Sequence, residues 1–393
     1  MPTWPIPNGY RFAGVVSRLR SEPDRRDLAL IVSDRPAACV GVFTQNRVAA
    51  APVHLCRERL PRTDARGVIV CSGNANACTG EQGYRDACRM AEIVADRIRC
   101  SPEQILVAST GVIGRPLPMP ILEAGIPLAV ERLQHASEAV EDAAHAILTT
   151  DTVMKVADRV LNQGIHLLGI AKGAAMIGPN LATMLAFLVT DAAVAVDDLQ
   201  TILRRAADRS FNRISVEGHT STNDTVLLFA NGSGPLLSGP ALAEFSAAVE
   251  DVCIDLAKAI ARDAEGAHHF VTIHVEGCRD EAEAVVVAKT VAHSALVKAA
   301  IYGADPNWGR IVSAAGYSGI PFAESELSLW LGDVLMYRQG VPVPFDAAAA
   351  SAYLRQNRDV TIRLKFSSGS GSCTFWTCDL TPEYVRLNAD YTT

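Results

Sequence analysis

Short apolar segments rich in β-branched residues alternate with longer amphipathic segments, and this alternation most constrains the fold of the chain. The short segments are typical of buried strands, and the longer ones of helices that bury one face. We expect strands at 28–32, 39–43, 67–71, 105–108, 226–230, 270–275, 327–331 and 360–366. We expect helices at 84–98, 137–148, 197–211, 240–261, 281–302 and 345–354, with Ser137 and Asp197 capping two of them. Such a mixture predicts an α/β or α+β fold.

The length and charge of the chain narrow its class further. Its 393 residues, 49% of them hydrophobic, exceed the usual size of a single core, so we expect two lobes. The net charge is -7 and no dense run of Lys or Arg occurs, which argues against nucleic-acid binding. The N-terminus does not resemble a signal peptide, and no apolar run approaches the roughly 18 to 20 residues that span a bilayer. We therefore expect a cytoplasmic protein.

Cysteine and histidine spacing gives no support for a metal site. None of the ten cysteines forms a Cys-x-x-Cys pair, and the nine histidines show no zinc-binding spacing. We expect reduced, mostly buried thiols and no bound metal.

A glycine-rich segment leads directly into an apolar run between Lys172 and Asp191. We expect a strand that starts at Thr183 and continues through 184–189. If the Ala182-Thr183 peptide were cut, Thr183 would carry a hydroxyl and a free amine, a nucleophile and a base in one residue. Its α-amine has a reference pKa of about 7.8, against about 10.4 for lysine, and so could act as a base at neutral pH. The local pattern alone favours an ordinary strand threonine.

This junction resembles the self-processing site of the ornithine acetyltransferase family of arginine biosynthesis (glutamate N-acetyltransferase, ArgJ). The family pattern is close to Lys-Gly-Ser-Gly-Met-Ile-Ala-Pro-Asn-Met-Ala-Thr-Met-Leu, and here Ala174-Ala175 replace Ser-Gly. Further matching blocks cover nearly the whole chain, at 72–80, 109–114, 149–152, 221–225, 263–266, 305–310 and 386–393. We interpret the blocks at 72–80, 221–225 and 305–310 as scaffold turns.

The resemblance implies a ping-pong reaction. The family cuts itself at the bond that corresponds to Ala182-Thr183, and the Thr183 hydroxyl then takes acetyl from N-acetylornithine and passes it to glutamate. Each half-reaction forms an oxyanion, and one well-aimed donor to it is worth about 3 kcal/mol. The resemblance assigns this role to Thr110 and Gly111, whereas the local sequence favours an ordinary turn after the strand.

The resemblance also assigns substrate binding to six residues: Thr149, Lys172, Thr183, Glu265, Asn388 and Thr393. Lys172 would face a substrate carboxylate and Glu265 the ornithine ammonium, since buried charges need opposite partners. The local sequence leaves open a solvated loop lysine and a helix-end acid. Thr150 is the alternative to Thr149, and a polar tail such as 386–393 is more often frayed.

By resemblance the fold is a layered α-β-β-α sandwich of the ornithine acetyltransferase and DmpA-like type, which resembles self-processing N-terminal-nucleophile enzymes. A second, smaller α/β lobe would draw on approximately 285–393. Residues 1–182 would form an α chain and residues 183–393 a β chain, assembled as a heterotetramer of two of each. No cofactor is implied, but some members also accept acetyl-CoA as donor, which the sequence leaves open. His268-His269 replace the usual Thr-Lys of the family and could alter the charge beside Glu265.

The sequence leaves three alternative functions open. A hydrolase of the same processing type, such as an aminopeptidase, would let water attack the acyl-enzyme. A specialised acetyltransferase of a secondary-metabolite pathway would share the chemistry. A binding protein that is never processed would keep Thr183 as a strand residue.

Overall fold

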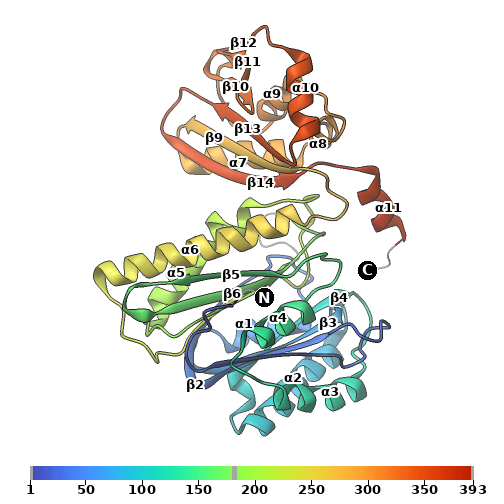
Figure 1. Cartoon of the computed structure of the whole chain (residues 1–393), viewed down its shortest axis with the longest axis vertical. Helices are drawn as coiled ribbons and strands as arrows, with labels where there is room; N and C mark the ends of the chain where they lie inside the picture. Colours follow the sequence, from blue (N-terminus) through green and yellow to red (C-terminus); the bar gives the residue numbers. More distant parts are fainter. Residues whose placement is uncertain (1–2, 179–183, 391–393) are drawn as a thin grey trace. The chain divides into compact units, whose positions relative to one another are not determined.

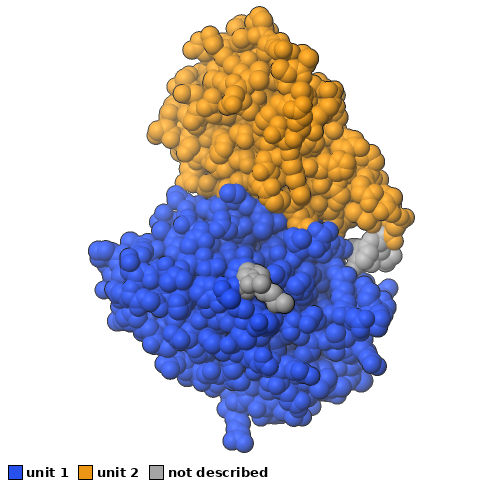
Figure 2. Space-filling view, in the orientation of Figure 1, with its two compact units in different colours: residues 1–212, 219–260, 393 blue, residues 213–218, 261–392 orange. Residues whose placement is uncertain are grey.

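The computed structural model describes residues 3–178 and 184–390, and the chain divides into two compact units. Figure 2 colours unit 1, from 1–212 and 219–260, blue and unit 2, from 213–218 and 261–392, orange. The predictions for Ala182, Thr183 and Thr393 concern residues outside those that the structure describes.

An eight-stranded sheet organises unit 1 (Figure 1). Its strands are β1 (Tyr10–Val15), β2 (Leu28–Phe43), β3 (Arg62–Asn74), β4 (Ile105–Val112), β5 (Lys155–Val160), β6 (His166–Lys172), β7 (Leu185–Thr190) and β8 (Thr225–Ala230). The order is β4-β3-β2-β8-β7-β6-β5, with β1 beside β2. The β3–β4 and β7–β8 pairs are parallel, and the other pairs are antiparallel.

The strand β2 joins the two halves of this sheet. Its first part pairs with β1 and β3, and its last part, from Ala38 to Phe43, pairs with β8. Asp34, Arg35 and Pro36 between them are exposed, and Pro36 has no N–H for the ladder. The two strands expected at 28–32 and 39–43 are therefore one strand with a bend.

The halves of the sheet and the helices of unit 1 form an α-β-β-α sandwich (Figure 1). Inward side chains of both halves share one core with α4 (Ser137–Ala146), including Phe12, Ile31 and Val70 from one half and Ile170, Phe187 and Phe229 from the other. The outward side chains of β3 and β4 pack against α2 (Gly80–Ile98) and α3 (Met119–Glu131). The other half is covered by α5 (Val196–Arg209) and α6 (Gly239–Arg262), and α1 (Ala51–Arg59) packs near β4 and α2. The expected sandwich is confirmed.

A six-stranded sheet in the order β12-β11-β10-β13-β9-β14 forms the frame of unit 2. Its strands are β9 (Phe270–Cys278), β10 (Ser328–Leu331), β11 (Val334–Arg338), β12 (Val341–Pro342), β13 (Asp359–Lys365) and β14 (Gly371–Cys378). The strand β9 lies between β13, to which it is parallel, and the edge strand β14, to which it is antiparallel. The helices are α7 (Glu281–His293), α8 (Ala295–Tyr302), α9 (Trp308–Gly316), α10 (Ala347–Gln356) and α11 (Pro382–Asp390).

Several expected boundaries were wrong. The helix expected at 281–302 breaks at Ser294, whose Oγ accepts a hydrogen bond from Val297 N at 3.4 Å and caps α8. The helices α4 and α5 follow Ala136 and Ala195, which make no side-chain cap, so Ser137 and Asp197 are not caps. The strand after the glycine-rich segment, β7, spans Leu185–Thr190, and the strand start predicted at Thr183 lies outside the described residues.

Within the described ranges, no single helix is long and apolar enough to cross a bilayer. The helices α7 and α8 meet that test only as a pair bent by 58°, and their buried apolar residues belong to the core of unit 2.

Candidate active site

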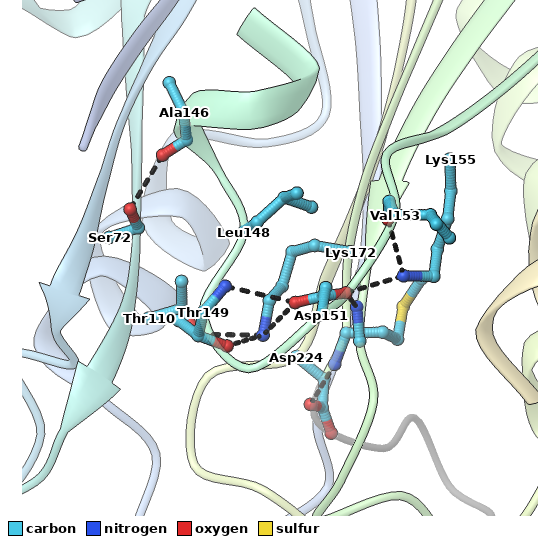
Figure 3. A network of polar contacts seen from close by, with 12 residues as sticks. Ser72, Thr110, Ala146, Leu148, Thr149, Asp151, Val153, Lys155, Lys172 and Asp224 are labelled. Carbon is cyan, nitrogen blue, oxygen red and sulfur yellow. Dashed lines mark hydrogen bonds and ion pairs between the residues drawn. The ribbon is translucent and has the colours of Figure 1, made fainter. Parts of the chain in front are cut away.

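Lys172, the last residue of β6, is buried beside two threonine hydroxyls (Figure 3). Its Nζ donates to Thr149 Oγ1 at 2.7 Å and to Thr110 Oγ1 at 3.4 Å. Only 2% of Lys172 is exposed, so it is not a solvated loop lysine. The structure thus brings together three of the residues to which the sequence assigned a role.

Thr110 and Gly111 lie inside β4, and not in a turn after it. Gly111 has φ 133°, and a Cβ on it would lie 2.3 Å from the carbonyl carbon of Gly73 on the neighbouring strand. Only glycine fits this position, because a side chain would clash with the backbone of β3 and the φ is unfavourable for other residues. The expected strand-end turn is wrong, and the close approach of β3 and β4 explains the glycine.

The Asp151 carboxylate accepts hydrogen bonds from several donors of this site. Its Oδ1 accepts from Lys155 Nζ at 2.8 Å and from Gly173 N at 2.5 Å, and its Oδ2 accepts from Thr149 N at 3.1 Å. Lys172 Nζ lies 3.8 Å from Oδ2. Burial alone would raise the pKa of Asp151, but the charges of Lys172 and Lys155 hold it well below its usual range. Asp151 is therefore ionised at neutral pH.

A second buried carboxyl, Asp224, holds the backbone at the start of β7. Its Oδ1 accepts from Met184 N at 3.1 Å, and Met184 directly follows Thr183. Among the described residues, Asp224 Oδ2 has no hydrogen-bond partner. Burial raises the pKa of Asp224 well above its usual value, and this effect outweighs the hydrogen bond from Met184 and the charge of Lys172, which lower it.

Glu265 and Asn388 meet within unit 2. Asn388 Nδ2 donates to Glu265 Oε2 at 3.0 Å. Asn388 lies in α11 rather than in a frayed tail. Gly266 has φ 65°, and a Cβ there would lie 2.6 Å from Tyr384 N, so glycine permits the approach of α11 to this segment.

The histidine pair beside Glu265 has other partners. His269 Nδ1 lies 2.7 Å from Asp379 Oδ2, and its Nε2 lies 2.9 Å from the Leu354 carbonyl oxygen. The ring of His268 packs against that of Tyr302 at 5.4 Å between centroids. His269 therefore links strand ends of unit 2 to each other.

The asparagine-rich blocks serve as scaffold, as expected. Asn223 Nδ2 donates to the carbonyl oxygens of Ala75 and Ser109, at 2.6 and 2.8 Å. Asn74 Nδ2 donates to two further loop carbonyl oxygens, and Asn307 caps α9. The bonds of Asn223 and Asn74 fix the loops near Thr110 in unit 1, and the Asn307 cap belongs to unit 2.

Three buried polar residues of this region received no role from the sequence: Asp151, Lys155 and Asp224. Asp151 and Asp224 stand inside matching blocks, which was the available signal, whereas Lys155 lies outside them. Within the described residues, no group of three or more His, Cys, Asp or Glu side chains could hold a metal ion.

Unit 1 is an α-β-β-α sandwich that buries an ionised aspartate and a lysine, and the lysine donates to two threonine hydroxyls. Such groups are costly to bury without a role, so this is the architecture of an enzyme. The chain belongs to the ArgJ family, whose model matches residues 11–393. This confirms the resemblance found in the sequence.

Similar proteins cover nearly the whole chain. "Arginine biosynthesis bifunctional protein ArgJ" of Thermosynechococcus vestitus is 47% identical over 98% of this chain and 96% of its own length. The protein of the same name from Geobacter sulfurreducens is 46% identical over 98% of this chain and 99% of its own. A crystal structure of the Bacillus halodurans protein of that name is 42% identical, with a TM-score of 0.51, over 52% of this chain and 98% of the solved chain.

Proposed function

We propose that this chain is an acyltransferase of arginine biosynthesis, a glutamate N-acetyltransferase that moves acetyl from N-acetylornithine to glutamate. The observation that carries this proposal is the buried Lys172 amine against the Thr149 and Thr110 hydroxyls, in a chain of the ArgJ family. An ammonium beside hydroxyl donors is suited to a substrate carboxylate, which both proposed substrates have.

The reaction would proceed in two steps through an acetyl ester. The Thr183 hydroxyl attacks the acetyl carbonyl of N-acetylornithine, and the α-amine of Thr183 takes the hydroxyl proton and passes it to the leaving ornithine nitrogen. The amine of glutamate then attacks the ester and restores the threonine. The Thr110 hydroxyl and the Gly111 N–H would stabilise the oxyanion of each step.

Substrate binding is assigned to the remaining residues one by one. Lys172 and Thr149 would hold a carboxylate. Glu265, positioned by Asn388, would attract the ornithine ammonium. Thr393 keeps the pocket role that the resemblance gives it.

A free amine on Thr183 requires autocatalytic cleavage after Ala182. Two observations support this part of the proposal. The solved Bacillus halodurans chain aligns over 98% of its length yet spans only 52% of this chain, as one product of a cut precursor would. Asp224 also holds the Met184 amide, one residue from the proposed new terminus.

The alternatives from the sequence are not favoured by the similar proteins. Relatives that are 46–47% identical over 98% of the chain carry an arginine-biosynthesis name, which speaks against a hydrolase, a secondary-metabolite enzyme or a non-catalytic binding protein. We further propose a cytoplasmic heterotetramer of two α and two β chains. Transfer through a threonine ester needs no cofactor, and acetyl-CoA enters only as a second donor.

The intact mass of the purified protein, with and without N-acetylornithine, tests the proposal. We expect two chains, the second of which begins at Thr183, and a gain of one acetyl group on the second chain when the donor is present and glutamate is absent. Glutamate should remove that acetyl group, and acetyl-CoA as sole donor should load it only if it is a second substrate. A single uncut chain, or loss of the acetyl group to water without glutamate, would contradict the proposal.

A further inference from the structure

A single carboxylate, Asp151, lies between two buried lysines next to the proposed substrate site (Figure 3). The side chains of Asp151 and Lys155 are both fully buried, with Lys155 Nζ 2.8 Å from Asp151 Oδ1. Lys155 Nζ also donates to the Val153 carbonyl oxygen at 3.1 Å. Lys155 thus approaches one carboxylate oxygen, while Lys172 approaches the other at 3.8 Å.

We propose that Asp151 and Lys155 form a buried positioning pair that fixes the position and the charge of the Lys172 amine, so that this amine binds a substrate carboxylate. The inference rests on the proposed function, because it names how one side of that site recognises an anionic group. Neither residue of the pair is assigned contact with the substrate.

The donors around Asp151 show what the pair positions. Oδ2 receives the backbone N–H of Thr149, whose hydroxyl in turn accepts from Lys172. Oδ1 receives the backbone N–H of Gly173, the residue after Lys172. One carboxylate therefore sets the backbone on both sides of the Lys172–Thr149 hydrogen bond. Loss of its charge would disturb each of these contacts together.

Energetics favour a functional reason for the pair. Burying two charges is costly, because each ion loses its hydration. Well-packed apolar residues of similar volume often stabilise a fold equally well or better, so stability alone does not explain the pair. Lys155 compensates part of the Asp151 charge, which moderates the attraction between Asp151 and Lys172. Asp224 is a further buried carboxyl that interacts with the charge of Lys172, and its raised pKa favours its neutral form.

The charge of Lys172 can be measured directly, because the chain has only six lysines. Protein labelled with ¹³C at lysine Cε gives six signals, which single Lys→Arg variants assign, and the signal of Lys172 reports its titration midpoint. In Asp151→Asn, which keeps the shape of the side chain, we expect this midpoint to fall by about 1 to 3 pH units because an opposite charge is lost. In Lys155→Met we expect it to rise, since a like charge is lost.

Opposite shifts separate the proposal from simple destabilisation, which would move both variants in the same direction. The matched control is Glu276→Gln, which removes the acid of the exposed Lys365–Glu276 pair, 4.0 Å apart, and should leave the Lys172 midpoint unchanged. An unchanged Lys172 midpoint in Asp151→Asn, or shifts of the same sign in both variants, would overturn the inference.

Kinetics give a second readout. In Asp151→Asn we expect KM for glutamate to rise about ten- to a hundredfold, because a charge-assisted contact of the substrate is misplaced. An unchanged KM would count against the pair. If the wild-type protein transfers no acetyl group, the proposed function fails, but the lysine titration still decides whether Asp151 and Lys155 set the charge of Lys172.

Discussion

At the residue scale, Ser109 and Thr110 are neighbours on β4 whose hydroxyls meet different partners. Ser109 Oγ accepts from Cys71 Sγ at 3.2 Å, on the side where β3 and β4 pack against α2 and α3. Thr110 Oγ1 instead accepts from Lys172. Because successive side chains of a strand point to opposite faces, only Thr110 is presented to the proposed reaction.

Thr110→Ala should therefore lower kcat about a hundredfold or more, the usual cost of losing one oxyanion donor, with little change in KM. Steady-state acetyl transfer from N-acetylornithine to glutamate is the measurement. Ser109→Ala, which removes a hydroxyl one residue away, is the matched control and should retain its kcat. Equal kcat values for Thr110→Ala and the wild type would remove Thr110 from the oxyanion role.

At the element scale, the His269–Asp379 pair joins the segment before β9 to the residue after β14. Asp379 Oδ1 accepts the backbone N–H groups of His268 and His269, at 2.9 and 3.0 Å, and Oδ2 faces the His269 ring. The opposite ring nitrogen faces the Leu354 carbonyl oxygen, so the doubly protonated ring satisfies both acceptors. The hydrogen bond to Asp379 raises the pKa of His269 above its usual value.

This shift predicts how stability depends on pH. The group has a raised pKa in the folded state, so its contribution is fully present below the unfolded pKa of about 6.5 and is lost as the pH rises through the folded value. We expect the difference in unfolding free energy between the wild type and His269→Gln to be largest near pH 6 and to shrink above pH 7. Urea unfolding at several pH values measures it. A difference that grows with pH would contradict the assignment.

At the scale of the whole molecule, the proposed cut falls between two strands of one sheet. Six residue pairs join β6 to β7, from Leu167–Thr190 to Lys172–Leu185, and six more join β2 to β8. Each pairing links residues before the cut to residues after it. Buried side chains from both segments also share the central core.

The two products should therefore stay together after cleavage. We expect two bands on a denaturing gel but a single peak by gel filtration in native buffer, with a light-scattering mass of two α and two β chains. Thr183→Ala, which cannot form the ester needed for cleavage, should give one band on the denaturing gel. Separation of the two products in native buffer would contradict this expectation.

Much of the secondary structure could be predicted because buried apolar residues recur along the sequence at the spacing of a helix or of a strand. The helix α2 and the strand β8 were both found from their apolar spacing. The edge strand β5 and the short β12 escaped, since their partly exposed residues lack such a pattern. The bend in β2 escaped because turn residues inside a strand imitate a strand end.

For the site, the order of residues was enough to show which residue types are present and which family they match, because the matching blocks can be recognised without coordinates. Thr110, Thr149 and Lys172 were chosen in this way. The three-dimensional fold was needed to show that Lys172 is buried, that Asp151 lies between it and Lys155, and that His269 faces Asp379. The reason is physical: burial and charge pairing depend on which strands lie side by side, and residues such as Thr110 and Lys172 meet across 62 positions of sequence.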